Sequence, residues 1–490
     1  MPTTPADSIA AHATYEPVIG LEVHVQLLTA SKIFCSCSTR FGAPPNSNVC
    51  PVCLGMPGAL PVLNKKVVEF ATLAAMALNC RINETSIFAR KNYFYPDLPK
   101  GYQISQYDKP LAEFGYIEIP AAKGKKKIGI TRVHLEEDAG KSLHEGFPDS
   151  DEKTAIDLNR TGVPLIEIVS EPDIASPDEA YEYLTRLKEI ILYTGVSDCN
   201  MEEGSLRCDA NVSVRLRGQK EFGTKAEIKN VNSFRFIREA LEYEIGRQIG
   251  VLESGGKITQ ETRLYNSNEG KTYSMRSKEQ AHDYRYFPEP DLLPLVVDEK
   301  WKSEIARSLP ELPEARRARM VKDYGITEYD AQVLTFSKAL ADQFEEAAKA
   351  AKNPKRVANL VQSELMGRLK AKGIAIEQSP ISMRGVASSA DLVESGAISG
   401  KMLKELYDLA FERSKDFPVI YEDEGRPQQS TDTSALEKMI DEVLAANPKQ
   451  LEQYRAGKTT MLGFFVGQVM KSTPSADAAA VNRVVRERLG

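Results

Sequence analysis

A run of eight residues near the N-terminus, Gly20 to Leu27, combines metal-binding side chains with strict alternation of hydrophobicity. Successive side chains of a β-strand point to opposite faces, so a strand here separates the run into two sets. One face carries Leu21, Val23, Val25 and Leu27. The other carries Glu22, His24 and Gln26. Carboxylates and imidazoles bind metal ions, and a sheet is rigid enough to hold them in a fixed arrangement, so the second face is a candidate for catalysis.

The same half-charged pattern recurs further along the chain. Arg207 to Arg215 sets Asp209 against an apolar face, and Thr224 to Asn230 places Lys225 on one side with two other charged residues. Glu167 lies inside an apolar run, where a carboxylate must be solvated, paired or bound to a metal. One such strand alone is more often a core strand with a solvated outer face. Its recurrence favours a functional charged sheet face.

Four of the seven cysteines form a cluster: Cys35, Cys37, Cys50 and Cys53. Two close pairs of thiols joined by a short loop can surround one tetrahedral ion. Disulfides and a redox pair are the alternatives, and a reducing cytoplasm disfavours disulfides. The first pair is Cys-x-Cys rather than Cys-x-x-Cys, which makes the motif less specific. We expect a structural zinc knuckle over residues 35–53, because no open ligand position is evident.

The composition is that of an ordinary globular protein of 490 residues, 42% hydrophobic and 27% charged. A formal charge of −6 argues against a protein that coats nucleic acid by charge alone, although a local basic surface remains compatible with it. No apolar run approaches the roughly 18 residues that a membrane helix needs. The first residues have no basic segment typical of a secretory signal. We therefore expect a cytoplasmic protein that makes no membrane contact.

The first 295 residues have the pattern of one mixed α/β domain. Strands are predicted near residues 17–28, 87–95, 115–119, 128–137, 164–169, 207–215 and 224–230. Helices are predicted over 65–79, from Pro177 to about Tyr193, and from Ser233 to about Ile249. Ser176 and Glu179 form a capping box with proline at the first helical position, which marks the start of the second helix.

Prolines between 288 and 313 punctuate a change in character, after which the pattern is helical. Helices are predicted over 314–323, 328–352, 354–372, 399–414, 434–446, 448–456, 459–472 and 477–488. The last 42 residues hold seven Lys or Arg against three Asp or Glu. This excess of positive charge suits either a small helical bundle with a solvated basic side or a nucleic-acid surface. The fold class is therefore α+β, with an all-helical C-terminal region.

Long motifs carry a family resemblance. They are Gly20–Leu27, Arg90–Asp97, Tyr102–Gln106, His134–Lys141, Asp157–Gly162, Leu165–Asp173, Met201–Asn211 and Asp283–Asp291. Together they resemble the B subunits of glutamine-dependent aspartyl/glutamyl-tRNA amidotransferases, over nearly the whole chain. The resemblance implies a catalytic cradle domain over 1–295, a helical domain over 296–410 and a YqeY-like helical tail over 411–490 that contacts tRNA.

The resemblance also implies the reaction. A tRNA for Gln or Asn is first mischarged with Glu or Asp, and the B subunit uses ATP and Mg²⁺ to phosphorylate the side-chain carboxylate. Ammonia, which an amidase (the A subunit) releases from glutamine, then displaces the phosphate. A small C subunit holds these two proteins together. Since the cysteine quartet occurs in only some members of the family, the zinc site would be structural.

The same resemblance assigns roles to residues of the charged face. Glu22, His24, Glu137 and Glu167 would form the catalytic, Mg²⁺-binding set. Alternation from His134 instead places Glu136 on the polar face, and only a bulge or strand end would bring Glu137 there. On a predicted aromatic strand, Lys91, Tyr93 and Tyr95 are candidates for the 3′ end of the tRNA, or form an ordinary surface strand. Asp209 and Lys225 are weaker candidates for the same pocket.

Two other functions fit parts of the pattern. The first is a zinc-stapled tRNA-binding scaffold without catalysis, but its polar face should be basic, because carboxylates repel phosphate. The second is a stand-alone carboxylate kinase, whose activity would not need a glutaminase partner.

Overall fold

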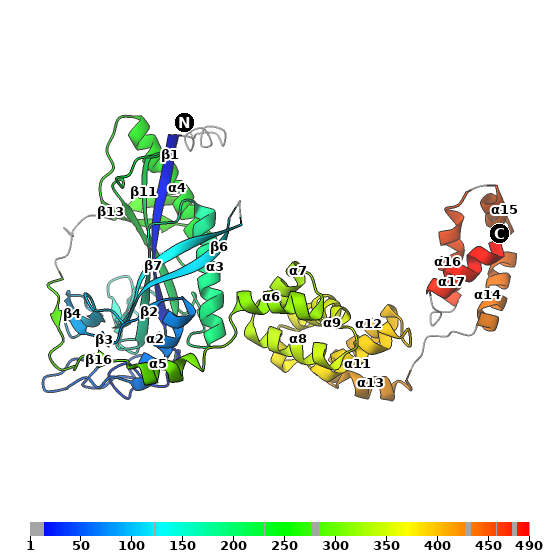
Figure 1. Ribbon diagram of the computed structural model, residues 1–490, viewed down its shortest axis with the longest axis horizontal. Helices are drawn as coiled ribbons and strands as arrows, with labels where there is room; N and C mark the ends of the chain where they lie inside the picture. The colour runs from blue at the N-terminus through cyan, green and yellow to red at the C-terminus, as the bar shows by residue number, and fades with distance from the viewer. Residues whose placement is uncertain are drawn as a thin grey trace. The chain divides into compact units, whose positions relative to one another are not determined.

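The computed structural model describes residues 14–121, 124–229, 231–275, 284–426, 433–456, 458–472 and 478–489. The chain divides into two compact units, Met1–Pro313 and Glu314–Gly490 (Figure 1). The sequence placed the boundary at residue 295. The first unit extends further because helix α5 (Glu299–Ala306) packs Ile305 into its core.

Within the described residues, the main sheet of the first unit has nine strands. Their order is β14 (Lys271–Ser274), β13 (Glu261–Asn266), β12 (Ala226–Lys229), β11 (Leu206–Leu216), β1 (Tyr15–Gln26), β10 (Pro164–Ser170), β7 (Gly124–Glu137), β6 (Ala112–Ala121) and β2 (Arg81–Ile82). Neighbours are antiparallel except β12 and β13. Strand β1 lies in the middle, so its side chains have strands on both sides.

Alternation along β1 separates the two faces of the sheet as the sequence predicts. Leu21, Val23 and Val25 are buried in a core shared with helices α2 (Lys65–Ala77), α3 (Pro177–Thr194) and α4 (Phe234–Glu253) (Figure 1). The predicted cap is also confirmed, since the Ser176 side chain accepts a hydrogen bond from the Glu179 backbone N–H. The helices leave the opposite, polar face of the sheet available for a site.

Smaller strand pairs complete the first unit. A three-stranded sheet has the order β15 (Phe287–Pro288), β4 (Phe88–Asn92) and β5 (Tyr102–Gln106). Two further pairs are β16 (Leu295–Val296) with β3 (Thr85–Ser86), and β8 (Lys141–Leu143) with β9 (Ala155–Asp157). The prediction of one strand over 87–95 is wrong in its second half. β4 ends at Asn92, where the amide side chain bonds the carbonyls of Tyr284 and Arg285.

The second unit is helical. Its helices are α6 (Pro313–Tyr324), α7 (Glu328–Leu334), α8 (Lys338–Ala350), α9 (Pro354–Leu360), α10 (Met366–Lys372), α11 (Met383–Glu394), α12 (Gly400–Arg413), α13 (Phe417–Asp423), α14 (Thr433–Ala446), α15 (Pro448–Arg455), α16 (Met461–Ser472) and α17 (Ala478–Leu489). A π-helical turn, Val361–Leu365, links α9 to α10, and Ile376–Gln378 is a 3₁₀ turn. None of the described helices is long and apolar enough to cross a membrane.

Two details of the helical prediction are wrong. The expected single helix over 328–352 is two helices, because Ser337 caps a new one by accepting a hydrogen bond from the Leu340 backbone N–H. The tail was expected to begin at residue 411. Phe411, Phe417 and Ile420 instead lie in the core of α6–α13, whereas the separate core of α14–α17 begins with Ile440.

Candidate functional site

Three side chains meet on the polar face of the sheet: His24 on β1, Glu136 on β7 and Glu167 on β10. The His24 Nε2 atom lies 3.3 Å from the nearer Glu167 oxygen and 3.7 Å from the nearer Glu136 oxygen. Candidate ligand atoms of the three residues all lie within 4.8 Å of one another. His134 completes the group, with its Nε2 3.6 Å from Glu167 and 3.8 Å from Glu136.

The strand register explains this meeting. His24 and Glu167 are directly opposed across β1 and β10, and Glu167 opposes His134 across β10 and β7. Directly opposed side chains on one face of an antiparallel pair have Cβ atoms roughly 5 Å apart. Three neighbouring strands thus bring together residues that lie far apart in the sequence.

The group holds acidic and basic side chains close together in a place that is largely shielded from water. Burial alone would lower the pKa of His24, but the hydrogen bond to Glu167 and the charges of Glu167 and Glu136 raise it. Burial alone would likewise raise the pKa of Glu167, but His134 and His24 hold it well below its usual value. Two carboxylates and an imidazole can hold a divalent cation.

Glu22 lies two residues before His24 on the same face of β1, but it is outside the close group of His24, Glu136 and Glu167. It accepts a hydrogen bond from the Asn211 side-chain amide at 3.0 Å and is the strand partner of Asp209. Burial and repulsion from Glu167 raise the pKa of Glu22. Burial also raises the pKa of Asp209, although Lys229 opposes that effect. Glu22 and Asp209 are therefore a second pair of acidic side chains on this face, and a nearby cation would favour their ionised forms.

Glu136 and Glu137 point to opposite sides. The pairing of β7 with β10 runs without a bulge through both residues, so alternation places Glu136 with His24 and directs Glu137 away. Glu137 is buried, forms an ion pair with Lys100 and accepts a hydrogen bond from the Ile104 backbone N–H at 2.8 Å. The structure thus brings His24 and Glu167 together with Glu136, while Glu137 belongs to a separate pair with Lys100.

Lys91 reaches the central group from β4 of the three-stranded sheet. Burial would lower the pKa of its ammonium, but the charges of Glu136 and Glu167 raise it. The ammonium also lies 4.9 Å from the ring centroid of Tyr284. Tyr93 is next to this cation, with its ring 6.1 Å from that of Tyr284. Lys91 is thus a fixed positive charge beside the carboxylates.

The remaining predicted residues lie further from the centre. The Tyr95 ring is 6.1 Å from that of Tyr93, but the residue is half exposed in the loop after β4. Lys225 is exposed just before β12. It lines a cavity of about 250 Å³ together with Glu22 and Asn211. This cavity adjoins the Glu22 side of the sheet face.

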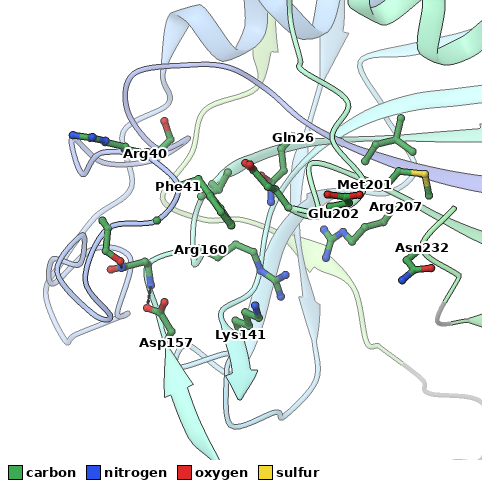
Figure 2. A pocket seen from close by; sticks show the side chains of 18 of the residues that line it. Gln26, Arg40, Phe41, Lys141, Asp157, Arg160, Met201, Glu202, Arg207 and Asn232 are labelled. Atoms are coloured by element: carbon green, nitrogen blue, oxygen red, sulfur yellow. Dashed lines mark hydrogen bonds between the residues drawn. The ribbon is translucent and has the colours of Figure 1, made fainter. Parts of the chain in front are cut away.

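A larger cavity of about 510 Å³ adjoins the other side of the centre (Figure 2). Gln26 and Arg207 reach it from the polar face, and Arg207 is the strand partner of His24. Both side chains donate to the buried carboxylate of Asp138, at 2.8 and 2.9 Å. The two arginines that flank Asp138, Arg207 and Arg160, hold its pKa below the usual value despite burial.

The four predicted zinc ligands, Cys35, Cys37, Cys50 and Cys53, are brought together, with their sulfurs within 4.8 Å of one another. All four are free thiols. Cys53 is an acceptor for the Cys50 backbone N–H at 3.1 Å, and the Lys32 ammonium lies 3.7 Å from its sulfur. A hydrogen bond from Cys35 lowers the pKa of Cys53 to about 4, despite burial. In contrast, the pKa values of Cys35 and Cys37 are raised, so the fit to zinc rests on the convergence of four thiols, the usual ligand set of a tetrahedral metal.

Sequence reasoning did not assign His134 to the site, nor Tyr284 and Tyr286, which lie near Lys91. His134 had a local signal, since it shares an alternating face with Glu136. The tyrosines had none, because they reach Lys91 from a distant part of the sequence. Asp283, which begins their motif, lies outside the described residues.

Taken together, the sheet face holds carboxylates, imidazoles and an ammonium between two cavities. Such an arrangement suits transfer of a charged group between anionic substrates, because fixed charges offset the charge that develops.

Comparison with known proteins agrees with an enzyme that transfers a charged group between anionic substrates. Residues 17–303 match the family described as "GatB/GatE catalytic domain", and residues 342–489 match "GatB domain". The B subunit of an aspartyl/glutamyl-tRNA(Asn/Gln) amidotransferase from Carboxydothermus hydrogenoformans is 59% identical over 476 residues, covering 97% of this chain and 99% of that protein. Proteins of the same description are 54% identical in Trichlorobacter lovleyi (97% and 99% covered) and 53% identical in Solidesulfovibrio magneticus (98% and 100% covered). The chain belongs to this family of amidotransferase B subunits.

The opposite directions of Glu136 and Glu137 lead to a prediction about metal binding. Mn²⁺ is a suitable probe, because it takes the same oxygen ligands as Mg²⁺ and is visible by electron paramagnetic resonance. Glu136→Gln should weaken Mn²⁺ binding by the full chain at least about tenfold, since it removes a charge beside His24 and Glu167. Glu137→Gln should leave Mn²⁺ affinity nearly unchanged. Loss of binding in Glu137→Gln with retention in Glu136→Gln would reverse the assignment.

The thiol cluster leads to a second prediction. Elemental analysis of the purified chain should find about one zinc per molecule. Cys50→Ser should lower both the zinc content and the melting temperature, because the loop between the cysteine pairs loses its crosslink. Cys80→Ser is the matched control, since that thiol is buried away from the cluster, and it should keep the zinc. A wild-type chain without zinc, or a Cys50→Ser variant with full zinc content, would refute the site.

Proposed function

We propose that the chain is the B subunit that performs the ATP-dependent step of tRNA-dependent amidation. Its substrates are tRNA(Gln) carrying Glu, tRNA(Asn) carrying Asp, or both. The side-chain carboxylate of the aminoacyl group attacks the γ-phosphorus of ATP, and ADP leaves. Ammonia then attacks the acyl carbon, and phosphate leaves with one former carboxylate oxygen. The family relationship supports the reaction, and the His24–Glu136–Glu167 group beside Lys91 is the observation that supports assigning it to this face.

The residues of the face have separate tasks in this account. A carboxylate is a poor electrophile, so the site must activate it and offset the negative charges that meet. The Lys91 ammonium supplies a positive charge where the two anions approach, and Tyr93 confines the reacting end of the aminoacyl group beside it. The set Glu22, His24, Glu136 and Glu167 has the donor atoms that a divalent cation needs. Mg²⁺ bound there would neutralise phosphate oxygens of ATP.

Asp209 and Lys225 are assigned to the nucleotide side of the face. Lys225 lines the cavity of about 250 Å³ that Glu22 borders, and Asp209 is the strand partner of Glu22. We place ATP on this side, because the carboxylates that would share its cation lie there. The zinc knuckle does no chemistry in this account.

The partners follow from the chemistry. The chain needs a source of ammonia, which an amidase (the A subunit) would release from glutamine, and a small C subunit would join the two. The reaction belongs to the cytoplasm, where aminoacyl-tRNA is used. A tRNA-binding scaffold without catalysis is disfavoured, because a face that carries Glu22, Glu136, Glu167 and Asp209 would repel a phosphate backbone. The other alternative, a stand-alone carboxylate kinase, would not need the A and C subunits.

Amidation by the assembled complex tests the assignment. Glu167→Gln should lower the rate of ATP-dependent amidation of mischarged tRNA by about a hundredfold or more, because it removes the charge shared by His24, His134 and Lys91. The complex should still hydrolyse glutamine. Glu118→Gln is a matched control on the outer strand β6, where Glu118 pairs with Lys125. Near-normal amidation by Glu167→Gln at saturating Mg²⁺ would overturn the assignment.

We assign binding of the tRNA body to the tail. The four helices α14–α17 have a core of their own, and the last 42 residues carry an excess of positive charge. Phosphate contacts contribute affinity in proportion to their number and weaken as salt rises. Truncation should follow Arg426, because Phe417 and Ile420 belong to the preceding core.

The truncated chain should show a raised KM for mischarged tRNA and a flatter dependence of KM on salt, with kcat little changed. The assay is amidation against tRNA concentration at two salt levels, for the full-length and truncated chains in complex. An unchanged KM with a collapsed kcat would mean that the tail organises the active site.

A further inference from the structure

A short segment, residues 284–291, lies along β4 next to Lys91. Its strand β15 pairs with β4 in an antiparallel ladder that sets Phe287 opposite Arg90. One step further along the same register, Tyr286 comes opposite Lys91, and alternation directs this next pair to the other face of the small sheet. The ladder consists of only two residue pairs. Other contacts must therefore fix the segment in place.

The first anchor is an ion pair between the segment and β4. The Arg90 guanidinium donates two hydrogen bonds to the two oxygens of Glu289, at 2.7 and 2.8 Å. The Glu289 carboxylate is fully buried, and its backbone N–H donates to the Phe88 carbonyl at 2.8 Å. The guanidinium carbon also lies 4.2 Å from the ring centroid of Tyr102. A bidentate, stacked pair fixes orientation as well as position, so residue 289 is tied to β4 in one geometry.

The second anchor is at the other end of the segment. The Asn92 backbone N–H and side-chain amide both donate to the Tyr284 carbonyl at 3.1 Å, and the amide donates to the Arg285 carbonyl at 2.8 Å. Arg285 has a φ of 44°, in the left-handed region that residues other than glycine rarely adopt. Such strain persists only where the surroundings impose it. The segment is therefore held in a strained turn between two anchors.

The face opposite Arg90 carries two tyrosines of the segment and Lys91. The Lys91 ammonium lies 4.9 Å from the ring centroid of Tyr284. The Tyr286 ring is 5.9 Å from that of Tyr284 and is stacked on Tyr107, at 4.2 Å and an interplanar angle of 6°. A lysine side chain has a flexible four-carbon stem, so its ammonium stays in one place only where neighbours exclude the other rotamers. These packed rings provide such neighbours.

We infer that the Arg90–Glu289 pair positions Lys91 for the reaction, by holding Tyr284 and Tyr286 against its side chain so that the ammonium stays on the charged face. Arg90 and Glu289 touch no substrate in this account and act through the tyrosines. The inference rests on the proposed function, in which Lys91 offsets the charge of two approaching anions. It adds two positioning residues from the face of the small sheet that points away from Lys91.

A pair that only stabilised the fold would behave differently from a positioning pair. A buried ion pair can often be replaced by apolar side chains of similar volume without loss of stability. If Arg90 and Glu289 are merely structural, such a replacement keeps the reaction intact. If they position Lys91, the fold survives the replacement but the rate falls.

Steady-state amidation by the assembled complex is the first measurement. Glu289→Gln should lower kcat roughly tenfold to a hundredfold, because a small displacement of the Lys91 ammonium weakens its action on the reacting groups. The KM values for ATP and mischarged tRNA should change little. Arg81→Gln is the matched control, since that guanidinium also pairs with a carboxylate, Glu113 at 3.4 Å, and lies 4.9 Å from an aromatic ring, Phe114, but on the outer strand β2. It should keep both kcat and KM.

A double-mutant cycle shows whether Glu289 acts through Lys91. Lys91→Met should itself lower kcat, and adding Glu289→Gln to it should cause no further loss, because the group to be positioned is already gone. Losses that multiply in the combined variant would overturn the inference. A wild-type complex that does not amidate, or a normal kcat in Lys91→Met, would instead refute the proposed function.

The variant Arg90→Met with Glu289→Leu separates positioning from stability. Neither charge is left unpaired in the interior, so its melting temperature should stay close to that of the wild type. Its kcat should nevertheless fall as in Glu289→Gln, measured where circular dichroism shows the chain to be folded. A wild-type kcat in this variant would mean that the pair is only structural and would overturn the inference.

Discussion

Two carboxylates, Glu136 and Glu167, lie almost out of water on one face of a sheet, and the rest of the first unit is arranged around them. Like charges in such a place repel strongly and resist ionisation unless cations are held nearby. Here His24 and His134 lie within 3.3 to 3.8 Å of the pair, and Lys91 raises the local positive charge. These cations lower the pKa of Glu167 despite its burial, which keeps its carboxylate available to a metal ion.

The sheet is what keeps this arrangement from relaxing. Residues of three neighbouring strands are set by backbone register, so none can move away without breaking ladder hydrogen bonds. Helices α2, α3 and α4 cover the apolar face and leave the charged face for substrates. A group of this kind on a loop would separate under its own repulsion. The fold therefore stabilises a cluster that the side chains alone would not form.

The sequence predicted the periodic parts of this arrangement well. Alternation from Leu21 to Val25 identified the buried face. The same rule pointed to Glu136, whereas the ligand set implied by the resemblance contained Glu137, which instead pairs with Lys100. Prediction failed where the outcome depended on contacts far apart in the chain. β4 ends at Asn92 because that side chain bonds a segment near residue 284, and no local pattern reports such a partner.

In the helical region, too, the prediction succeeded where the signal was local and failed where it depended on distant contacts. Capping residues such as Ser176 and Ser233 were recognised, because a cap acts locally. Helices α11 and α13 were missed, although Ser382 caps α11 in the same way and the Asp416 side chain accepts from the first N–H of α13. The division between the two helical cores was also placed too early, because membership of a core depends on packing and not on composition. The positions of Phe417 and Ile420 could be known only from the structure.

The account makes the charged face the place where a carboxylate oxygen is transferred to phosphate. Oxygen-isotope tracing tests this most directly. Glutamyl-tRNA labelled with ¹⁸O in its side-chain carboxylate should be amidated by the complex with ATP and glutamine, and the released phosphate analysed by mass spectrometry. One ¹⁸O is expected in each phosphate released with a product amide, and labelled phosphate should form about a hundredfold more slowly when Glu167→Gln replaces the wild-type chain. Amidation that proceeds at the normal rate with unlabelled phosphate would contradict it.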